Sequence, residues 1–398
     1  MATFTSFKTR NSIVKRCISD DQTRLRLKYN PYYLPFDRQV GSHVWLDGKE
    51  LIMLSSNDYL GLSDHPKVIE AGKKALEEWG SGTTGSRFAN GSRYFHEKLE
   101  SDLASFLGKE ACHVSVAGYI SCMSSIESFA RKGDLIIVDR NVHSSLWAGI
   151  ANTGARLERF GHNNIESLKE VLGQESPEIT KMLVVEGVFS MEGHIANLPD
   201  YLTVIQNQNC FIVVDDAHGL GVLGKQGRGT VDYFGVTDQV DVIAGSMSKS
   251  MASTGGFVAG STEIIEYLRT HSKQTVFSAA LSPCQTACAQ AALDVIKEEP
   301  EHLQHLWDNT RYYHKLLLDL GLDIWESKTP ATPIVLGKIE SAYYFWKKLM
   351  QKGVFTNIIP PPAVSPNKIL IRTAISARHS KEDLEKIGEA MKFAAKGL

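Results

Sequence analysis

The sequence lacks an excess of charge of either sign. Its 398 residues include 43 Lys and Arg against 45 Asp and Glu, which leaves a formal net charge of −2. Proteins that hold nucleic acid usually carry a basic excess, so this balance argues against a nucleic-acid partner. No apolar run approaches the roughly 18 residues that a membrane-spanning helix requires. Hydrophobic residues make up 43% of the chain, enough to build a core and to exclude a mainly disordered protein.

Cysteine is scarce, and its spacing argues against two kinds of site. The six cysteines form no C-x-x-C pair, and no group of Cys and His has the spacing of a zinc site. We therefore predict no metal centre, and reduced, buried thiols in a protein of the cytoplasm. The six residues are Cys17, Cys112, Cys122, Cys210, Cys284 and Cys288.

Acidic residues are missing from the first 19 positions, which carry Lys8, Arg10, Lys15 and Arg16. A basic start without acids resembles a mitochondrial targeting segment. We favour the alternative, a solvated basic arm. The apolar stretch of a secretory signal is also missing.

From about residue 64 onward, segments typical of helices and of strands alternate. Short β-branched apolar runs without polar alternation predict strands that are buried on both faces. Strands separated by helices indicate an α/β fold with a mainly parallel sheet. The predicted helices span Pro66–Trp79 and Tyr94–Leu107, and the predicted strands span Leu135–Val138, Met182–Val185, Phe211–Val214 and Val240–Ala244.

The pattern changes near Pro300, where a smaller α+β domain is predicted to begin. A long helical stretch at Glu301–Leu320 precedes strands at Thr332–Leu336 and Ile369–Ala374, flanked by helices at Glu340–Gln351 and Lys381–Ala395. We therefore divide the chain into three parts. Residues 1–60 form an N-terminal arm and lead-in segment, residues 61–290 the major domain, and residues 291–398 the small C-terminal domain.

A glycine-rich segment at Gly219–Gly224 has the G-x-G-x-x-G spacing of a dinucleotide-binding loop and follows a predicted strand. That function requires a helix to begin at the loop. The next residues, Lys225–Thr230, have no helical apolar period. We therefore interpret the segment as a glycine-rich loop beside a site, and not as a nicotinamide site.

Two polar groups follow neighbouring predicted strands. Asp215 ends the run Phe211–Val214, and Lys249 follows the run Val240–Ala244. Taken alone, Asp215 is more typical of a helix cap or surface turn, and Lys249 of a solvated turn. Because ligands of open α/β sheets bind at the carboxyl ends of strands, the combination suits a pyridoxal phosphate (PLP) site.

The chemistry of PLP explains why these residue types occur together. The lysine amine must lose its proton to bond the cofactor aldehyde. A carboxylate opposite the ring nitrogen keeps that nitrogen protonated, so that the ring can accept electrons. The phosphate needs backbone N–H groups at a helix start together with hydroxyls. Ala117–Ile120 can supply the N–H groups, and Ser246 and Ser248 the hydroxyls.

Seven motifs in order resemble the α-oxoamine synthases, a branch of the fold-type I PLP enzymes. That family includes serine palmitoyltransferase, 8-amino-7-oxononanoate synthase, 2-amino-3-ketobutyrate CoA ligase and 5-aminolevulinate synthase. The resemblance covers most of the chain, from about Met53 to His379. The motifs are Ser56–Leu62, Gly80–Arg87, Asp139–Leu146, Glu186–Gly193, Asp215–His218, Ser246–Lys249, and Pro361–Val364 leading to Arg372.

The resemblance implies a role for each of the cofactor-binding residues. Lys249 forms the Schiff base and moves the substrate α-proton, and Asp215 partners the pyridinium nitrogen. His218 hydrogen-bonds the phenolic oxygen of the ring, and His143 stacks on its face. Further contacts, to the ring or to the phosphate, come from Gly118, Tyr119, Ser190, Ser246 and Ser248.

The resemblance also assigns residues to the substrate and to a second subunit. Arg372 binds the carboxylate of the amino acid, because a guanidinium fork matches a carboxylate, and Asn57 assists it. Ser278 reaches the phosphate of the cofactor in the partner subunit, which implies a homodimer with shared active sites.

The implied reaction is a decarboxylative condensation of a small amino acid with an acyl thioester, giving an α-amino ketone, CoA and CO₂. Details at Gly85–Arg87, Ser248–Ser250 and Ser253–Phe257 favour a serine palmitoyltransferase-like enzyme, with serine ahead of alanine or glycine. The alternatives are an 8-amino-7-oxononanoate synthase, which joins alanine to a pimeloyl thioester, or a synthase that uses a carrier-protein thioester. An aminotransferase and a non-catalytic partner subunit remain as alternatives from other classes.

Overall fold

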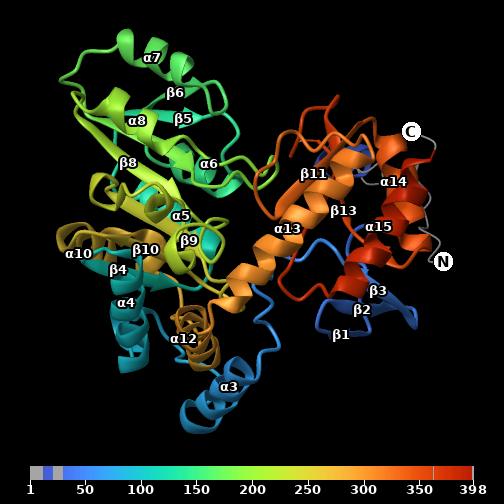
Figure 1. Ribbon diagram of the computed structural model, residues 1–398. Coiled ribbons are helices and arrows are strands. Elements are labelled where there is room, and N and C mark those ends of the chain that lie inside the picture. The colour runs from blue at the N-terminus through green and yellow to red at the C-terminus, as the bar shows by residue number, and fades with distance from the viewer. Residues whose placement is uncertain (1–11, 21–29, 362, 397–398) are drawn as a thin grey trace.

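The computed structural model describes residues 12–20, 30–361 and 363–396 (Figure 1). Lys8 and Arg10 of the basic arm, and Pro362 of the Pro361–Val364 motif, lie outside the described residues. The largest sheet has seven strands in the order β4-β10-β9-β8-β7-β5-β6, and only β10 runs antiparallel to its neighbours. Its strands are β4 (Ala111–Ser115), β5 (Leu135–Asp139), β6 (Arg156–Phe160), β7 (Lys181–Glu186), β8 (Cys210–Asp215), β9 (Val242–Ser246) and β10 (Gly256–Gly260).

The central strands form where the sequence has uninterrupted apolar runs. Every residue of β5, β7, β9 and β10 is buried, because helices cover both faces of the sheet. The mainly parallel sheet is therefore confirmed, and the strand predicted at Val240–Ala244 begins two residues later, at Val242. The helices between the strands are α5 (Gly118–Glu127), α6 (Ser144–Ala151), α7 (Ile165–Gly173), α8 (Leu198–Ile205) and α10 (Thr262–His271).

Three helices pack at one end of this sheet (Figure 1). The predicted bounds of α3 (Pro66–Trp79) and α4 (Tyr94–Leu107) are confirmed, and α12 (Pro283–Glu298) packs along α3. The start of α3 follows local chemistry. His65 caps it by accepting a hydrogen bond from the backbone N–H of Lys67, and Pro66 occupies the first helical position.

The C-terminal third forms a second body with its own small sheet. Antiparallel strands lie in the order β11 (Ala331–Gly337), β14 (Ile369–Ala374) and β13 (Asn357–Ile359). The helices of this body are α13 (Glu301–Asp319), α14 (Ile339–Gln351) and α15 (Lys381–Ala395). The bounds of β11, β14 and the three helices lie within one residue of those predicted from the sequence, and β13 was not predicted.

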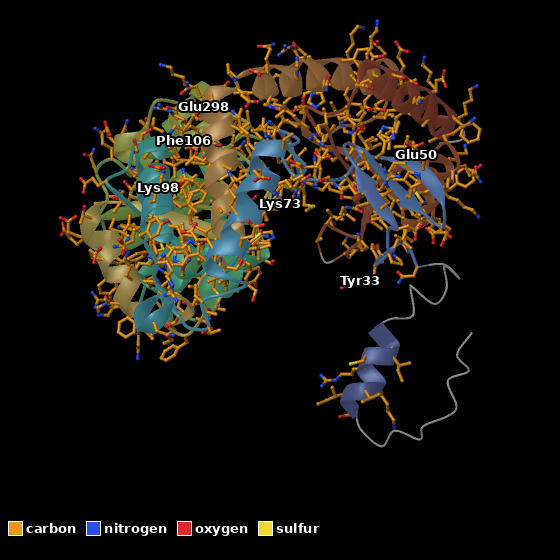
Figure 2. All side chains as sticks on the ribbon, turned by 90° about the horizontal axis from the view of Figure 1, so that it is seen from below. Tyr33, Glu50, Lys73, Lys98, Phe106 and Glu298 are labelled. Carbon is orange, nitrogen blue, oxygen red and sulfur yellow. The ribbon has the colours of Figure 1, made fainter. Side chains whose placement is uncertain are left out.

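The strands nearest the N-terminus belong to this second body. β1 (Arg38–Val40), β2 (His43–Leu46) and β3 (Lys49–Met53) form an antiparallel sheet whose β3 pairs in parallel with β12 (Val354–Phe355). Figure 2 shows Glu50 on that body, and Lys73, Lys98 and Phe106 on the other. The sequence analysis placed residues 38–53 with the N-terminal arm. Its division at residues 60 and 290 stays a prediction.

The remaining elements are short. The described segment of the N-terminal arm, α1 (Ser12–Asp20), stands apart from both bodies (Figure 2). The Gly219–Gly224 loop leads into a single 3-10 turn, η2 (Lys225–Gly227), and not into a long helix, as expected. The others are η1 (Arg87–Gly91), α9 (Thr230–Tyr233), η3 (Thr237–Gln239) and α11 (Lys273–Val276). Taken over the described residues, every helix falls short of the length and hydrophobicity that crossing a bilayer demands.

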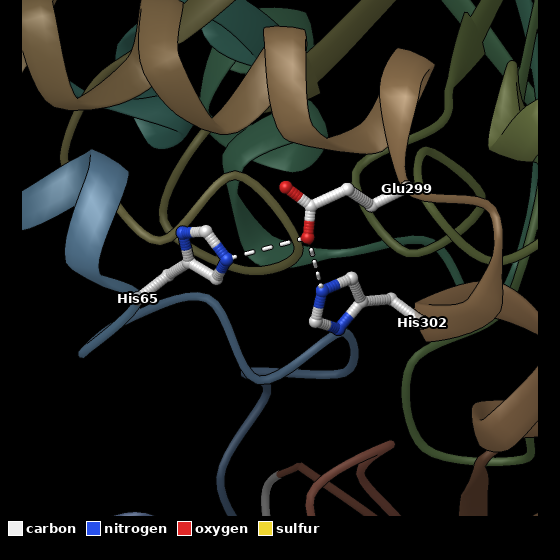
Figure 3. Close-up of side chains that lie close together, drawn as sticks. All are labelled: His65, Glu299 and His302. Atoms are coloured by element: carbon white, nitrogen blue, oxygen red, sulfur yellow. Dashed lines mark hydrogen bonds and ion pairs between the residues drawn. The ribbon is translucent and has the colours of Figure 1, made fainter.

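A cluster of charged and imidazole side chains lies where the start of α3 meets the turn between α12 and α13 (Figure 3). The Glu299 Oε2 lies 3.4 Å from His65 Nε2 and 3.3 Å from His302 Nε2, and Lys67 Nζ lies 2.8 Å from Glu299 Oε1. Because His65 Nδ1 accepts the Lys67 N–H, its Nε2 carries the ring proton and faces Glu299 as a donor. The cluster thus ties the start of α3 to the turn between α12 and α13.

Candidate active site

Asp215 and Lys249 meet at the carboxyl edge of the large sheet. Asp215 is the last residue of β8 and is only 4% exposed, and its Oδ1 accepts the Ala217 N–H at 3.0 Å. Lys249 follows β9, and its pKa is lowered, chiefly by burial and further by Arg372, while the charge of Asp215 opposes the shift. This environment favours the free amine of Lys249 more than water does.

A second carboxyl group lies next to Asp215. Glu186 ends β7 in register with Asp215 and is 2% exposed. Burial raises its pKa well above the ordinary value, and the charges of Asp215 and Glu192 add to the shift. This environment favours the protonated form of Glu186 more than water does. The sequence analysis quoted the Glu186–Gly193 motif but gave this residue no role, because only the strand register places it beside Asp215.

Tyr59 joins His218 to Arg372. Its hydroxyl lies 2.8 Å from His218 Nδ1 and accepts a hydrogen bond from Arg372 Nη2 at 3.3 Å. The hydroxyl donates to Nδ1 when the ring proton of His218 lies on Nε2, and accepts from Nδ1 in the other tautomer. Burial, followed by the positive charges of Lys249 and Arg372, lowers the pKa of His218 well below its ordinary value. Tyr59 lies in the Ser56–Leu62 motif, but the sequence analysis assigned it no role.

Arg372 is a buried guanidinium within β14. It is 5% exposed, and its Nε donates to the carbonyl oxygen of Ser190 at 2.8 Å. The Ser190 N–H in turn donates to Glu186 Oε2 at 3.2 Å. The motif around Ser190 therefore contacts the site through its backbone, linking Arg372 to the carboxyl group beside Asp215.

His143 caps helix α6. Its Nδ1 accepts from the Ser145 N–H at 3.3 Å and lies 2.8 Å from the Ser145 hydroxyl. Burial lowers its pKa, with Asp215 opposing and Lys249 adding to the shift. Because Nδ1 accepts the Ser145 N–H, the ring proton lies on Nε2. The ring of Tyr119 approaches it edge-on, with centroids 6.2 Å apart.

A tight cradle forms where α5 begins beside β9. A side chain at Gly118 would place its Cβ 2.5 Å from Ser246 Cβ, so only glycine fits. The Ser246 and Ser248 hydroxyls are 2.6 Å apart at this point. The methyl side chain of Ala117 cannot cap α5, so the first N–H groups of the helix remain available to an anion.

Two further site residues predicted from the sequence are Asn57 and Ser278. Asn57 is half-buried, and its Oδ1 has no hydrogen-bond partner among the described residues. Ser278 lies on the β4 side of the sheet, where it lines a small cavity with Arg87, His113 and Ser115. The structure thus gathers most of the predicted residues at β7, β8 and β9 and sets Ser278 at the flank.

Nearly the whole chain is similar in sequence to a known protein family and to named relatives. The family model "Aminotransferase class I and II" matches residues 49–391. A serine palmitoyltransferase of Sphingobacterium spiritivorum is 38% identical over 360 residues, 90% of each chain. The 8-amino-7-oxononanoate synthase 1 of Bacillus velezensis is 40% identical over 362 residues, 91% of this chain and 93% of the relative.

Solved structures agree with these relatives. Serine palmitoyltransferase of Sphingomonas wittichii superimposes with a TM-score of 0.93 at 34% identity, covering 97% of this chain and 98% of that one. A structure described as SPT with PLP internal aldimine gives a TM-score of 0.94 at 31% identity, covering 97% and 99%.

The geometry in this chain fits PLP. The Gly118 cradle beside two serine hydroxyls suits a phosphate, buried Asp215 suits a protonated ring nitrogen, and the lowered pKa of Lys249 suits bonding to an aldehyde. The fold-type I architecture and the PLP cofactor predicted from the sequence are therefore confirmed. The chain belongs to the aminotransferase class I and II family, in the α-oxoamine synthase branch that holds serine palmitoyltransferases and 8-amino-7-oxononanoate synthases.

Proposed function

We propose that this α-oxoamine synthase condenses serine with a long-chain acyl-CoA, releasing CoA and CO₂. The observation that carries the proposal is one charged cluster that holds an amine, a carboxylate and a guanidinium: Lys249, Asp215 and Arg372. PLP, when bound, supplies an aldehyde for the lysine and a ring that takes up electrons from the α-carbon of the amino acid.

Lys249 is the proposed proton carrier of the reaction. Its lowered pKa favours the free amine more than water does, and a free amine can accept the α-proton and later return it. Asp215 would hold the ring nitrogen of bound PLP, and its charge would keep this nitrogen protonated. The raised pKa of neighbouring Glu186 favours its neutral form, which lessens the repulsion between the two carboxyl groups.

Arg372 and Asn57 are the proposed groups for the amino-acid substrate. Two of the five guanidinium N–H donors of Arg372 are used by Ser190 and Tyr59, and the remaining donors can pair with a carboxylate. The Asn57 Oδ1, without a partner among the described residues, offers an acceptor. Neutral His143, with its proton on Nε2, is the proposed donor to a substrate oxygen, besides stacking on the cofactor ring.

The second candidate joins alanine to a pimeloyl thioester. It rests on similarity, because relatives named 8-amino-7-oxononanoate synthase are as similar in sequence as those named serine palmitoyltransferase. A carrier-protein thioester in place of CoA is a variant of either reaction. We favour serine because the SPT structures superimpose more closely than the 8-amino-7-oxononanoate synthase of Francisella tularensis, whose TM-score is 0.76.

The release of free thiol by the PLP-loaded protein tests the reaction. We expect release from palmitoyl-CoA that depends on serine and is much slower with alanine or glycine, measured with a chromogenic thiol reagent. Pimeloyl-CoA with alanine is the matched comparison. Faster release from that pair would favour the second candidate. Transamination by the amino acid alone, with no need for a thioester, would instead indicate an aminotransferase.

We also propose a homodimer with shared sites, located in the cytoplasm. Next to Ser278, Phe277 is 85% exposed, and Phe88 on the adjoining η1 is 61% exposed. Exposed aromatic residues that gather in one place are typical of an interface. The proposed location rests on the cysteines. All six are free thiols in the described residues, and free thiols are typical of a reducing compartment such as the cytoplasm.

Subunit mixing tests whether the sites are shared. Lys249→Ala and a bulky Ser278→Tyr variant are each expected to be inactive. If one site takes Lys249 from one subunit and Ser278 from the other, mixed dimers contain one intact site, and activity recovers to about a quarter of the wild-type value. Sedimentation of the wild-type protein as a monomer, or no recovery despite subunit exchange, would contradict the proposal.

A further inference from the structure

We propose that His65, Glu299 and His302 form a site for a divalent transition metal such as zinc, where α3, α12 and α13 meet (Figure 3). The proposal goes beyond the condensation reaction and does not depend on it. Each residue offers one ligand atom, and these atoms all lie within 4.8 Å of one another. Two imidazoles and one carboxylate are a set of ligands that zinc enzymes use. The sequence analysis predicted no metal centre, since only folding brings His65 to the other two residues.

The distances in the cluster fit a tetrahedral metal better than they fit hydrogen bonds. His65 Nε2 and His302 Nε2 lie 3.4 Å and 3.3 Å from Glu299 Oε2. An N–H···O hydrogen bond is usually about 2.7–3.2 Å long. Ligand atoms about 2.0–2.1 Å from a tetrahedral zinc ion lie about 3.3–3.4 Å apart, because a tetrahedral edge is about 1.6 times the bond length. Both separations are therefore those expected between ligands of one ion.

The three ligands come from the ends of three helices. His65 caps the start of α3, Glu299 follows the last residue of α12, and His302 lies in the first turn of α13. The two imidazole rings are inclined by 75° with centroids 5.8 Å apart, so they do not stack. The side chains are 15% exposed for His65 and 23% for the other two, so an ion can enter from solvent and water can complete the tetrahedron.

Lys67 holds the oxygen of Glu299 that faces away from the imidazoles. Its Nζ lies 2.8 Å from Glu299 Oε1 and 3.2 Å from Glu298 Oε2. One ammonium thus faces two carboxylates, which leaves an excess of one negative charge to attract a cation. Carboxylates that bind metals are commonly held by such an outer hydrogen bond. Lys67 therefore orients Glu299 and leaves Oε2 free for the metal.

Metal binding requires a change of tautomer at His65. Its Nδ1 accepts the Lys67 N–H at 3.3 Å, so the ring proton lies on Nε2 before the metal binds. When Nε2 bonds the metal through its lone pair, this proton moves to Nδ1 and the ring stays neutral. The long capping hydrogen bond is then lost, and the bond to the metal takes over the task of fixing the start of α3.

Zinc titration of the PLP-loaded, full-length protein tests the site. Three variants each remove one ligand: His65→Asn, Glu299→Gln and His302→Ala. Asparagine at the first position keeps a side-chain acceptor that can cap α3, so loss of the imidazole is separated from loss of the cap. The matched control is His305→Ala, at an exposed histidine of α13. The readouts are the Kd for Zn²⁺ from calorimetry and the visible spectrum of bound Co²⁺, whose bands are strong in a tetrahedral site.

We expect wild type to bind one zinc ion per chain at this site. Each ligand variant should weaken binding at least about 100-fold, because even the outer partners of metal ligands are worth about 10–100-fold in affinity. The control should bind zinc as wild type does. Zinc should also raise the melting temperature of wild type and of the control, since the ion binds only the folded chain. Mg²⁺ should not compete, because it prefers oxygen ligands.

Two results would overturn the inference. Either wild type binds no zinc, or the ligand variants bind it as tightly as wild type, which would place the ion elsewhere, for example at the thiols of Cys284 and Cys288. Melting temperatures without zinc show whether each variant folds. Failure of the proposed reaction is a separate result, because zinc binding is measured without serine or a thioester.

Discussion

Replacing Lys249 with alanine is expected to lower kcat at least about a thousandfold, because it removes both the group that bonds the cofactor and the base that takes the α-proton. The loss should appear in thiol release with saturating serine and palmitoyl-CoA. PLP should still bind without a covalent bond, since the Gly118 cradle and Asp215 do not depend on the lysine. Borohydride reduction followed by peptide mass spectrometry should find the cofactor on Lys249 in wild type alone.

A charge-preserving variant separates chemistry from electrostatics. Lys249→Arg keeps the positive charge near Asp215 but has no amine that loses its proton at neutral pH. It should be as inactive as the alanine variant, whereas Lys315→Ala, at an exposed lysine of α13, should be unaffected. Activity of Lys249→Arg within tenfold of wild type would show that this lysine contributes only its charge.

Replacing Arg372 with alanine is expected to raise the KM for the amino acid about 100-fold, because a buried charged hydrogen bond to the substrate carboxylate is worth about 3 kcal/mol. The KM for the thioester should change little. Lysine at this position should recover only part of the affinity, since its ammonium cannot form the paired bonds of a guanidinium. Initial rates at varied serine and fixed thioester concentration give both constants.

The effect must be separated from loss of structure. Arg372 also donates to Ser190 and Tyr59, so Arg372→Ala removes two internal bonds. Tyr59→Phe removes the bond to Tyr59 and keeps the guanidinium, and Arg311→Ala changes an exposed guanidinium on α13. An unchanged KM for the amino acid in a folded Arg372→Ala protein would refute the assignment.

The helices and strands that could be predicted from the sequence are those whose signals lie within a few residues of one another. The apolar runs of β5, β7 and β8 and the bounds of α3 and α4 follow from periodicity and end signals, which act within a few residues. The family resemblance added the cofactor and the fold. Both were confirmed by relatives that cover nearly the whole chain. The roles given to single residues stay predictions.

The contacts that escaped prediction depend on packing between distant segments. Glu186 meets Asp215 through strand register, and Tyr59 meets Arg372 although the two residues lie 313 positions apart in the chain. No periodicity encodes these pairs. The pairing of β3 with β12 was also missed. β12 has only two residues, which is too short for a recognisable strand pattern.

The parallel pairing of β3 with β12 has a consequence for the order in which the newly made chain folds. The strands β1 to β3 leave the ribosome before the large sheet, but their partner β12 follows only about 300 residues after β3. The large sheet lies wholly between them in the chain, so it is synthesised and can fold while the edge of β3 is still open. An open edge invites pairing with other chains. Until β12 is made, the edge of β3 is therefore a place where a chaperone can protect the chain from wrong pairing.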